Sequence, residues 1–316
     1  MKDGKKITAS REESTSYMNQ TLPMRESFDL IQRDLMIGER VASFYFINGL
    51  NKDDDMLKLM DALLKIKKED MPAGILQFME MAIPYTEVEL IEDFDQVLKN
   101  LFSGVTCLFV DGYEGAIAID CRTYPARSVE EPDKDKSLRG SRDGFVETVV
   151  SNTAMIRRRI RSEHLVMEMQ EVGDSSRTDI AICYMKDRVN KEILCDLRQK
   201  VLSIRTDDLR MNQQSLAECL MKRKWYNPFP KFKFTERPDT AAACLFEGKV
   251  VLLVDNSPSA MILPTSILDV IEEANDYYFP TLTRVYLKSA RGLISFLTIF
   301  LTPVFLLFMQ NLNWLP

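Results

Sequence analysis

The sequence contains a single histidine, His164, and it lacks the short motifs that mark several large enzyme classes. There is no G-x-x-x-x-G-K-[ST] phosphate loop, no G-x-G-x-x-G dinucleotide fingerprint and no G-x-S-x-G nucleophile elbow. A lone histidine beside Glu163 is more typical of an exposed loop than of a general base or a zinc ligand. Asp111 and Asp255 could pass for catalytic carboxylates, but turn chemistry explains both. We therefore predict a chain that is not an enzyme, with no catalytic residues, no cofactor and no metal.

Paired cysteines and a secretion signal are also missing. The six cysteines are scattered without a C-x-x-C pair, and most lie in apolar stretches, which favours a reducing cytoplasm over a disulfide framework. Residues 1–21 are polar and lack the apolar core of a signal peptide, so we predict a disordered tail over residues 1–24. The net charge of −6 argues against a nucleic-acid partner.

Charge is absent from the last part of the sequence. The segment Gly292–Pro316 has no Asp, Glu, Lys or Arg, and its core Leu293–Met309 is at the short end of the roughly 17–25 residues that span a bilayer. Arg284, Lys288 and Arg291 stand just before it, which places the upstream part in the cytoplasm by the positive-inside rule. The alternative is a buried core helix, but the regular polar positions of an amphipathic helix are missing. We predict a transmembrane helix, with the lipid bilayer as a partner.

Two stretches of the remaining sequence repeat without a gap. LFSGVTCLFVD (Leu101–Asp111) and LFEGKVVLLVD (Leu245–Asp255) align at an offset of 144 residues. Each predicts a helix, a glycine stop, a strand, a tight turn and a second strand, with Gly104 and Gly248 as helix C-caps. A chance repeat is the alternative, because strands after glycine are common. The predicted fold class is α/β, with two related α/β subdomains from an internal duplication followed by the transmembrane helix.

This organisation gives a set of expected segments. They are the tail 1–24, an α/β subdomain 25–126, a charged connector and helix 127–160, a second α/β subdomain 161–283, and a basic flank with the membrane helix 284–316. In the connector helix, Asp143 is a plausible N-cap and three arginines, Arg157 to Arg159, lie in the last turn. These arginines indicate either an anion or lipid-headgroup patch or a solvated helix end that matches the helix dipole.

Several longer motifs resemble a known family. RSVEEPDKDKSLRGSRDGFVET, NTAMIRRRI, NPFPKFKFTERPD and EGKVVLLVDNSPSAMILPT are similar, in this order, to the signatures of the spore-germinant-receptor A-subunit family. The R-G-S-R-D-G-F-V-E and N-P-F-P motifs are most similar to those of its stage V sporulation AF branch. The resemblance implies a protein of the inner membrane of bacterial spores, with a two-part cytosolic domain before a bundle of membrane helices. Only the first helix of such a bundle is present in this sequence.

The resemblance also implies partners and signature positions. It implies assembly with other membrane subunits of a germination complex, or with further copies of the chain, and a complex that couples nutrient sensing to ion release. The signature positions are Glu131, Arg139, Gly140, Arg142, Asp143, Gly144, Phe145, Glu147, Asn152, Arg157, Arg158, Arg159, Glu236, Arg237, Pro238, Asp239, Asp255 and Pro258.

These positions suggest interdomain or partner contacts rather than catalysis. We expect Arg139 and Arg142 to pair with acidic neighbours such as Glu131 or Glu236 and to lock the connector between the subdomains. The alternative is a ligand site in a cleft between the two subdomains. Three functions follow: a subunit that transmits a conformational signal, a solute-binding regulatory module, and an enzyme of an unrecognised type.

Overall fold

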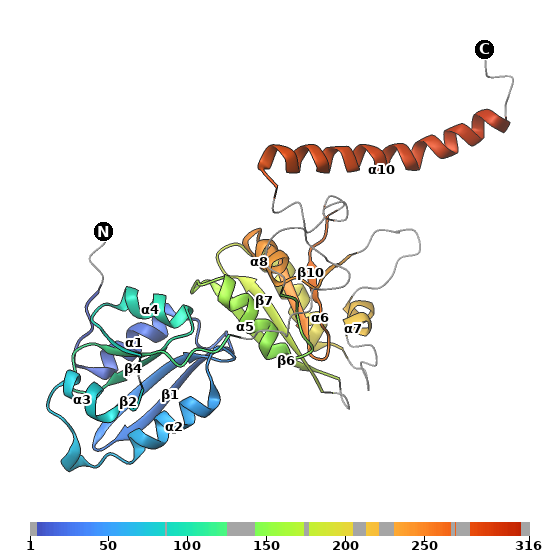
Figure 1. Ribbon diagram of the computed structural model, residues 1–316. Helices are drawn as coiled ribbons and strands as arrows, with labels where there is room; N and C mark the ends of the chain where they lie inside the picture. The colour runs from blue at the N-terminus through green and yellow to red at the C-terminus, as the bar shows by residue number, and fades with distance from the viewer. Residues whose placement is uncertain are drawn as a thin grey trace.

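The computed structural model of this chain describes residues 5–85, 87–124, 143–173, 177–204, 213–220, 231–266, 269 and 279–310. It consists of two α/β units that lie side by side and a long C-terminal helix, α10 (Thr281–Gln310), as Figure 1 shows. The predicted fold class, a duplicated α/β structure followed by one apolar helix, is confirmed.

The first unit is a five-stranded antiparallel sheet with helices on both faces. Its strand order is β1-β2-β4-β5-β3. The strands are β1 (Leu30–Ile37), β2 (Arg40–Ile47), β3 (Val88–Ile91), β4 (Thr106–Val110) and β5 (Ala116–Ile119). The helices are α1 (Arg11–Thr21), α2 (Asp53–Leu64), the 3-10 turn η1 (Lys68–Asp70), α3 (Ile75–Ala82) and α4 (Phe94–Phe102). The α1 and α4 helices pack on one face of the sheet, and α2 and α3 pack on the other.

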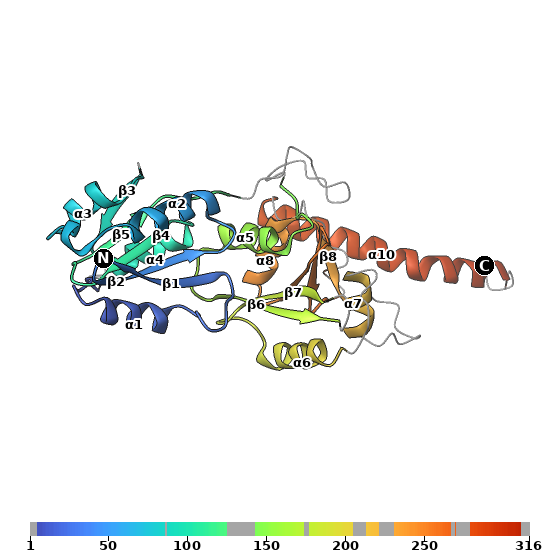
Figure 2. The ribbon, with the colours of Figure 1, turned by 90° about the horizontal axis from the view of Figure 1, so that it is seen from below.

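The second unit repeats this arrangement. Its strand order, β6-β7-β9-β10-β8, matches that of the first unit when β6 to β10 are set against β1 to β5 in chain order. The strands are β6 (Leu165–Val172), β7 (Thr178–Met185), β8 (Lys233–Thr235), β9 (Val250–Val254) and β10 (Ala260–Leu263), and the helices are α5 (Val149–Arg159), α6 (Lys191–Leu202), α7 (Gln213–Leu220) and α8 (Pro238–Phe246). Figure 2 shows α5 and α8 on the opposite side of this sheet from α6 and α7, in agreement with the two buried clusters.

The turn chemistry read from the repeat is confirmed. Gly104 and Gly248 follow the ends of α4 and α8 and have φ of 91° and 84°, the left-handed conformation that ends a helix without strain in glycine. Gly112 and Asn256, at φ of 80° and 58°, make the turns that join β4 to β5 and β9 to β10. The helix end and the following turn therefore use the same left-handed backbone conformation in both copies.

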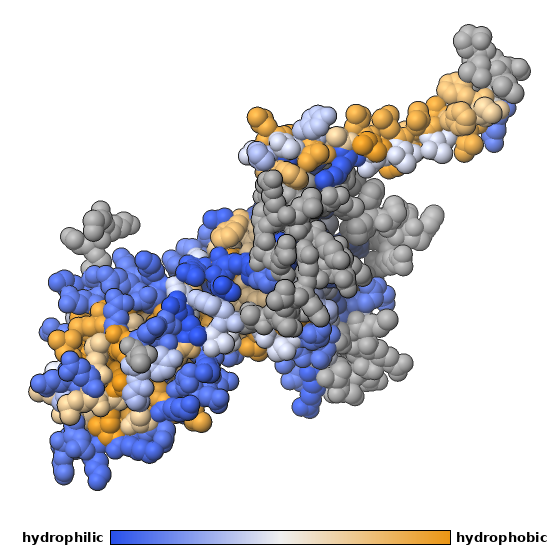
Figure 3. Space-filling view, in the orientation of Figure 1, coloured by the Kyte–Doolittle hydropathy of each residue, from blue (hydrophilic) through white to orange (hydrophobic). Residues whose placement is uncertain are grey.

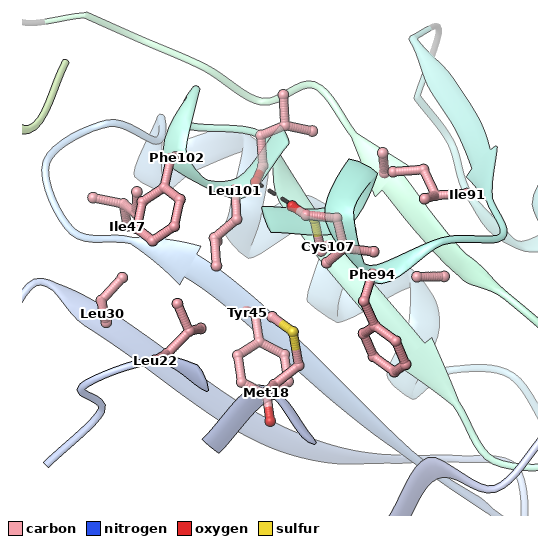
Figure 4. Packing of buried hydrophobic residues seen from close by; sticks show 14 of the residues in the cluster. Met18, Leu22, Leu30, Tyr45, Ile47, Ile91, Phe94, Leu101, Phe102 and Cys107 are labelled. Atoms are coloured by element: carbon pink, nitrogen blue, oxygen red, sulfur yellow. Dashed lines mark hydrogen bonds between the residues drawn. The ribbon is translucent and has the colours of Figure 1, made fainter. Parts of the chain in front are cut away.

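The prediction of a disordered tail over residues 1–24 is wrong for residues 5–24, which the structure describes. Residues 11–21 form α1, which starts after the N-cap Ser10, whose hydroxyl accepts from Glu13 N. Met18 is fully buried in the first unit, and the Tyr17 ring lies 4.3 Å from that of Phe94. Figure 4 shows Met18 packed beside Tyr45 under the sheet. The helix escaped prediction because a few apolar contacts, rather than a broad apolar stripe, hold it on the sheet.

The connector helix also differs from its prediction. It begins at Val149 after the N-cap Thr148, not at Asp143, and it packs on α8, β7 and β9 as an integral helix of the second unit. Val149 and Ile156 of this helix, Phe145 before it and Ile160 after it are all buried.

The α10 helix is long and apolar enough to cross a membrane, with a mean hydropathy of 2.3 in its most apolar window. Residues 293–310 are all exposed within the described part of the chain, which is contrary to the alternative of a buried core helix. Figure 3 shows hydrophobic residues along most of its length. Pro303 lies inside the helix, as is tolerated in membrane helices.

Candidate functional site: the junction between the two units

Arg157, in the last turn of α5, is fully buried where the two units meet. Its Nε donates to Asp29 Oδ2 over 2.6 Å, and its Nη2 donates to Asp29 Oδ1 over 3.1 Å. Nη2 also donates to Ser27 Oγ over 3.3 Å and to the Leu165 carbonyl over 3.1 Å, and Nη1 donates to the Ser162 carbonyl over 3.1 Å. Asp29 and Ser27 precede β1 of the first unit, so the contact joins the units. We call Arg157, Asp29 and Ser27 the junction clasp.

Backbone groups join the units at the same place. Ser27 Oγ donates to Asp29 Oδ1 over 2.6 Å and accepts from Met167 N over 3.0 Å, while Phe28 N donates to Met167 O over 3.0 Å. Met167 lies on β6, the edge strand of the second sheet. The segment before β1 is therefore hydrogen-bonded to that edge strand by a side chain and by its backbone.

The buried charges make this contact sensitive to the loss of either partner. Removing one member of a buried ion pair typically costs about 3–5 kcal/mol, because the other charge is left in an apolar environment. Each of the three guanidinium nitrogens of Arg157 has an acceptor, so the desolvation of that group is compensated. Burial raises the pKa of the Cys183 thiol, and the Asp29 charge raises it further while Arg157 opposes the shift. The geometry fixes the angle between the two units.

A glycine allows α5 to approach the first unit closely. Gly49, in the loop from β2 to α2, has φ of 80°, and a Cβ there would lie 3.1 Å from Ala154 Cβ and 3.2 Å from Val150 O. Any larger residue would be strained in its backbone and would press on α5. Beside this contact, Arg161 Nη1 donates to Ser103 Oγ over 3.1 Å. Two loops of the first unit thus rest against the second unit around the clasp.

The junction also contains a groove of about 740 Å³, which we call the junction groove. The first unit lines it with the end of α1 and the loop that follows, and the second unit lines it with Glu163, His164 and Lys186. Lys186 Nζ lies 2.7 Å from Glu26 Oε1 across the two units, and His164 Nε2 lies 3.8 Å from Glu163 Oε1. Its other lining residues are the polar Ser16, Asn19, Gln20, Thr21, Arg25 and Gln32 and the apolar Leu22, Pro23 and Met24.

Part of the predicted signature lies outside the described residues, namely Glu131, Arg139, Gly140 and Arg142. The lock predicted for Arg139 and Arg142 therefore stays a prediction. Glu236, one of their expected partners, accepts a hydrogen bond from Phe145 N through its backbone carbonyl over 2.9 Å. Arg157 forms the buried interunit ion pair among the residues that the structure describes.

Many other signature positions surround α5 within the second unit. Asp255 Oδ1 accepts from Val149 N over 3.0 Å at the start of the helix, and Asn152 bonds with both Val146 N and Val146 O. Asn256 N donates to the Glu147 carbonyl over 2.8 Å. Gly144 is buried, whereas Glu147 and Pro258 are exposed. Asp255, which was explained by turn chemistry alone, also satisfies the N-terminus of α5.

The three arginines at the end of α5 have three different environments. Arg157 is buried in the clasp, so neither an anion patch nor a solvated helix end describes it. Arg158 is exposed, with Cζ 4.1 Å from the centre of the Tyr124 ring. Arg159 forms an ion pair with Asp143, so Asp143 has this contact instead of the predicted N-cap role. Both predicted alternatives, an anion patch and a solvated helix end, are therefore wrong for Arg157.

A second buried arginine organises the start of α8. Arg237 has no exposed surface, and its Nε and Nη2 donate to the two carboxylate oxygens of Asp239 over 3.0 and 2.5 Å. Pro238 occupies the first turn of the helix, and Asp239 lies in that turn. This part of the signature is internal to the second unit, in contrast to the clasp.

Asp29 and Ser27 were missed from the sequence. They lie 128 and 130 residues before Arg157, so no local pattern connects them. The available signal was a short repeat: Ser27-Phe28-Asp29-Leu30 precedes β1 just as Ser162-Glu163-His164-Leu165 precedes β6. It would have directed attention to the segment before each first strand.

The comparisons with known proteins agree with this description. Residues 16–316 match the family model described as "Bacillus/Clostridium GerA spore germination protein". The chain is 36% identical to stage V sporulation protein AF of Bacillus subtilis (strain 168), over 95% of this chain and 61% of that protein. It is 28% identical to spore germination protein KA of the same organism, over 88% of this chain and 52% of that protein. The chain thus spans about half to three fifths of the length of these relatives.

One solved structure has the same architecture. The crystal structure of the N-terminal domain of the A subunit of the Bacillus megaterium spore germinant receptor GerK3 aligns with a TM-score of 0.62. The alignment covers 84% of this chain and 99% of that domain, at 22% sequence identity. At this identity, the likeness supports the fold alone.

Proposed function

Because the chain belongs to the Bacillus/Clostridium GerA spore germination protein family, we propose that it is a membrane-anchored subunit of a spore germination complex. Its two-unit head lies on the cytoplasmic side of the inner spore membrane, α10 enters the bilayer, and other membrane subunits are its partners. The complex takes part in nutrient-triggered ion release, and this subunit passes a conformational signal rather than catalysing a reaction.

The observation that carries this proposal is the junction clasp. Buried hydrogen bonds between Arg157 and Asp29 hold the two units at one angle, so a force on either unit moves the whole head. The second unit leads along the chain to α10, whose apolar surface is exposed. A stiff head connected to a membrane helix is suited to transmit movement between bound subunits and the bilayer.

Germination of spores tests this proposal. Spores that carry the Arg157→Gln variant should release potassium ions more slowly after nutrient addition, with Arg158→Gln as the matched control on the same helix. The charge-free pair Asp29→Asn with Arg157→Gln separates lost signal from lost protein, because it removes the buried charge from both sides. The amount of each variant in the membrane fraction is measured in parallel. Unchanged ion release in spores that lack the protein altogether would refute the proposal.

The orientation has a separate test. Cys195 on α6 and Cys219 on α7 are exposed, whereas Cys107, Cys121, Cys183 and Cys244 are buried. In a Cys219→Ser background, a membrane-impermeant maleimide should label Cys195 in inside-out vesicles and leave it unlabelled in sealed right-side-out vesicles, with the double variant Cys195→Ser and Cys219→Ser as the control for background labelling. Labelling in right-side-out vesicles alone would place the head on the opposite side.

The absence of catalysis is part of the same proposal. It is supported by the exposed position of His164 and by the structural roles of Asp111 and Asp255, which accept from the first amides of α1 and α5. Turnover of any substrate by the purified chain that disappears in a His164→Gln variant would contradict it.

A second candidate function, a solute-binding regulatory module, is favoured by the junction groove. A groove of about 740 Å³ between two units is large enough for a small organic solute, and such sites are common at domain junctions. Thermal unfolding of the detergent-solubilised chain against a panel of nutrients and nucleotides tests this function. A raised midpoint with at least one compound supports it, and no change with any compound removes it.

A further inference from the structure

The β1 strand lies at the edge of the first sheet and offers a row of backbone groups to solvent. It pairs with β2 over eight consecutive residues, without a bulge or a proline. Asn48 N donates to the Asp29 carbonyl, so the odd-numbered residues of β1 bond to β2 and the even-numbered ones point their backbone groups outward. The outward amides and carbonyls of Gln32, Asp34 and Met36 have no hydrogen-bond partner among the described residues. Such a row is a template for a further strand.

The equivalent edge of the second sheet already binds a segment from outside that sheet. Met167 is the counterpart of Gln32, because each is the third residue of its edge strand, β6 or β1. Met167 O accepts from Phe28 N over 3.0 Å, and Met167 N donates to Ser27 Oγ over 3.0 Å. One copy of the fold therefore uses this edge to bind another part of the polypeptide, and the other copy keeps the edge open.

A hollow of about 200 Å³ lies beside β1 on the side of the sheet that α2 covers. Arg33 of β1 and Leu57 of α2 both line it. Arg33 is exposed and makes no hydrogen bond or ion pair with any residue that the structure describes. Leu57 is 70% exposed, although α2 packs on the sheet through other residues. A cation and an apolar side chain thus share the surface next to the open edge.

The second unit fills the equivalent place with ionic and polar contacts of its own. The counterparts follow from matching positions in matching elements: Arg33 with Glu168 as the fourth residue of β1 and β6, Phe46 with Tyr184 as the seventh of β2 and β7, and Met60 with Arg198 as the eighth of α2 and α6. Arg198 Nε donates to Glu168 Oε2 over 2.9 Å, and Tyr184 Oη donates to Glu168 Oε1 over 2.6 Å.

The charge at this place is reversed in the first unit. A guanidinium, Arg33, replaces the carboxylate, and the apolar side chains of Phe46 and Met60 replace its two donors. All three line the hollow. The first unit thus presents a cation without the counter-charge that the second unit supplies internally. A guanidinium of this kind is suited to bind a carboxylate with two parallel hydrogen bonds.

We propose that the β1 edge binds an extended segment of a different polypeptide, and that an acidic side chain of this segment pairs with Arg33. The segment adds as an antiparallel strand, as all the described strand pairs of this sheet do, and bonds to the outward backbone groups of β1. Side chains alternate across a strand, so the residue two positions from the acid lies opposite Leu35 and is apolar. This inference rests on the proposed function for the presence of partner subunits, and it adds the surface and chemistry of one contact.

A designed peptide tests this surface on the full chain in detergent. The probe is the fluorescently labelled strand Thr-Lys-Glu-Thr-Val-Thr-Val-Lys with blocked ends, which places the glutamate and both valines on one face. A glutamine in place of the glutamate is the charge control, and N-methyl groups on the two inner threonines remove N–H groups that would face β1. We expect saturable fluorescence anisotropy with the glutamate peptide, about tenfold weaker binding of the glutamine form, and no binding of the N-methylated form.

Variants of the chain connect this binding to β1. Arg33→Gln should remove the preference for the glutamate peptide, whereas Arg25→Gln, at another exposed arginine of the first unit, should keep it. Met36→Pro removes one outward N–H at an edge position where proline is tolerated, so it should weaken both the glutamate and the glutamine peptides about tenfold. Met36→Ala keeps that N–H and is the matched control.

Several results would overturn the proposal. Equal affinity for the glutamate and glutamine peptides would remove the ionic contact, and equal binding of the N-methylated peptide would remove strand addition. No saturation by any peptide, with the variants folded, would remove the site. A fall in the mass of the chain on peptide addition, measured by light scattering, would assign the edge to a second copy of this chain instead. Ion release from Arg157→Gln spores is independent of these results, so the proposed function is tested separately.

Discussion

The two units share one strand order, yet they contribute opposite kinds of side chain to the junction. The first unit provides a buried carboxylate before its first strand, and the second unit provides a buried arginine at the end of its first helix. The junction groove is lined by Asn19 of the first unit and His164 of the second. The two units thus keep one strand order, and their junction combines a buried contact with an open groove.

Breaking the clasp should have the largest effect on stability. Arg157→Ala leaves Asp29 buried without its partner, so we expect the free energy of unfolding to fall by about 3–5 kcal/mol. Chemical denaturation of the detergent-solubilised chain measures this loss. The neighbouring Arg158→Ala is the control, because it removes an exposed cation–π contact with Tyr124 that is worth about 0.5–1 kcal/mol. Equal losses in the two variants would show that the clasp contributes no more than a surface contact.

A further ion pair distinguishes the second unit from the first. Lys249, at the start of β9, lies 2.7 Å from Asp269, whereas Val105 stands at the equivalent place in the first unit. Burial opposes ionisation of Asp269, but hydrogen bonds from Lys249 and Ser266 outweigh it and lower its pKa to about 2. The contribution is therefore present above the ordinary value of 3.8 and is lost as the pH falls towards 2.

The pH dependence of unfolding tests this pair. Asp269→Asn should lower stability at neutral pH by about 2 kcal/mol and flatten the loss of stability between pH 4 and pH 2. Asp61→Asn, which removes an exposed partner of Lys65, is the control and should leave the profile nearly unchanged. An Asp269→Asn profile parallel to that of the unchanged chain would contradict the role given to this carboxylate.

The two helix-capping aspartates, Asp111 and Asp255, differ in whether a second residue also caps the helix. α1 has both Ser10 and Asp111 at its N-terminus, whereas the first amide of α5 donates to Asp255. Asp255→Ala should therefore cost about 1–2 kcal/mol, and Asp111→Ala about 0.5 kcal/mol, because Ser10 continues to cap α1. Thermal unfolding of both variants measures the difference. A larger loss of stability in Asp111→Ala than in Asp255→Ala would contradict these capping roles.

The smallest effect is expected at the groove. Lys186 and Glu26 are exposed, so Lys186→Gln should cost less than about 1 kcal/mol, and the cost should shrink further at high salt. Unfolding at low and high ionic strength measures it. A loss as large as that of Arg157→Ala would make the groove side as fixed as the clasp side and would remove the contrast.

Local chemistry explains which parts of this structure the sequence could predict. The duplication, the left-handed glycines Gly104 and Gly248 and the exposed apolar α10 follow from composition and spacing, and the structure confirms them. The α1 helix was missed because its polar sequence hides the buried Met18. The clasp was missed because Asp29 and Arg157 meet only through tertiary packing, and the arginine expected on a surface is fully buried. Long-range pairs of single residues leave no periodic pattern to read.

Hydrogen exchange at the junction tests the central claim, that the clasp makes the two units one body. The amides of Phe28 and Met167 join the units, and those of β4 and β9 report on the two cores. We predict that peptides containing Phe28 and Met167 exchange as slowly as the core strands, and that Arg157→Ala releases the junction peptides first. Rapid exchange of Phe28 and Met167 in the unchanged chain, while both cores stay protected, would contradict the account.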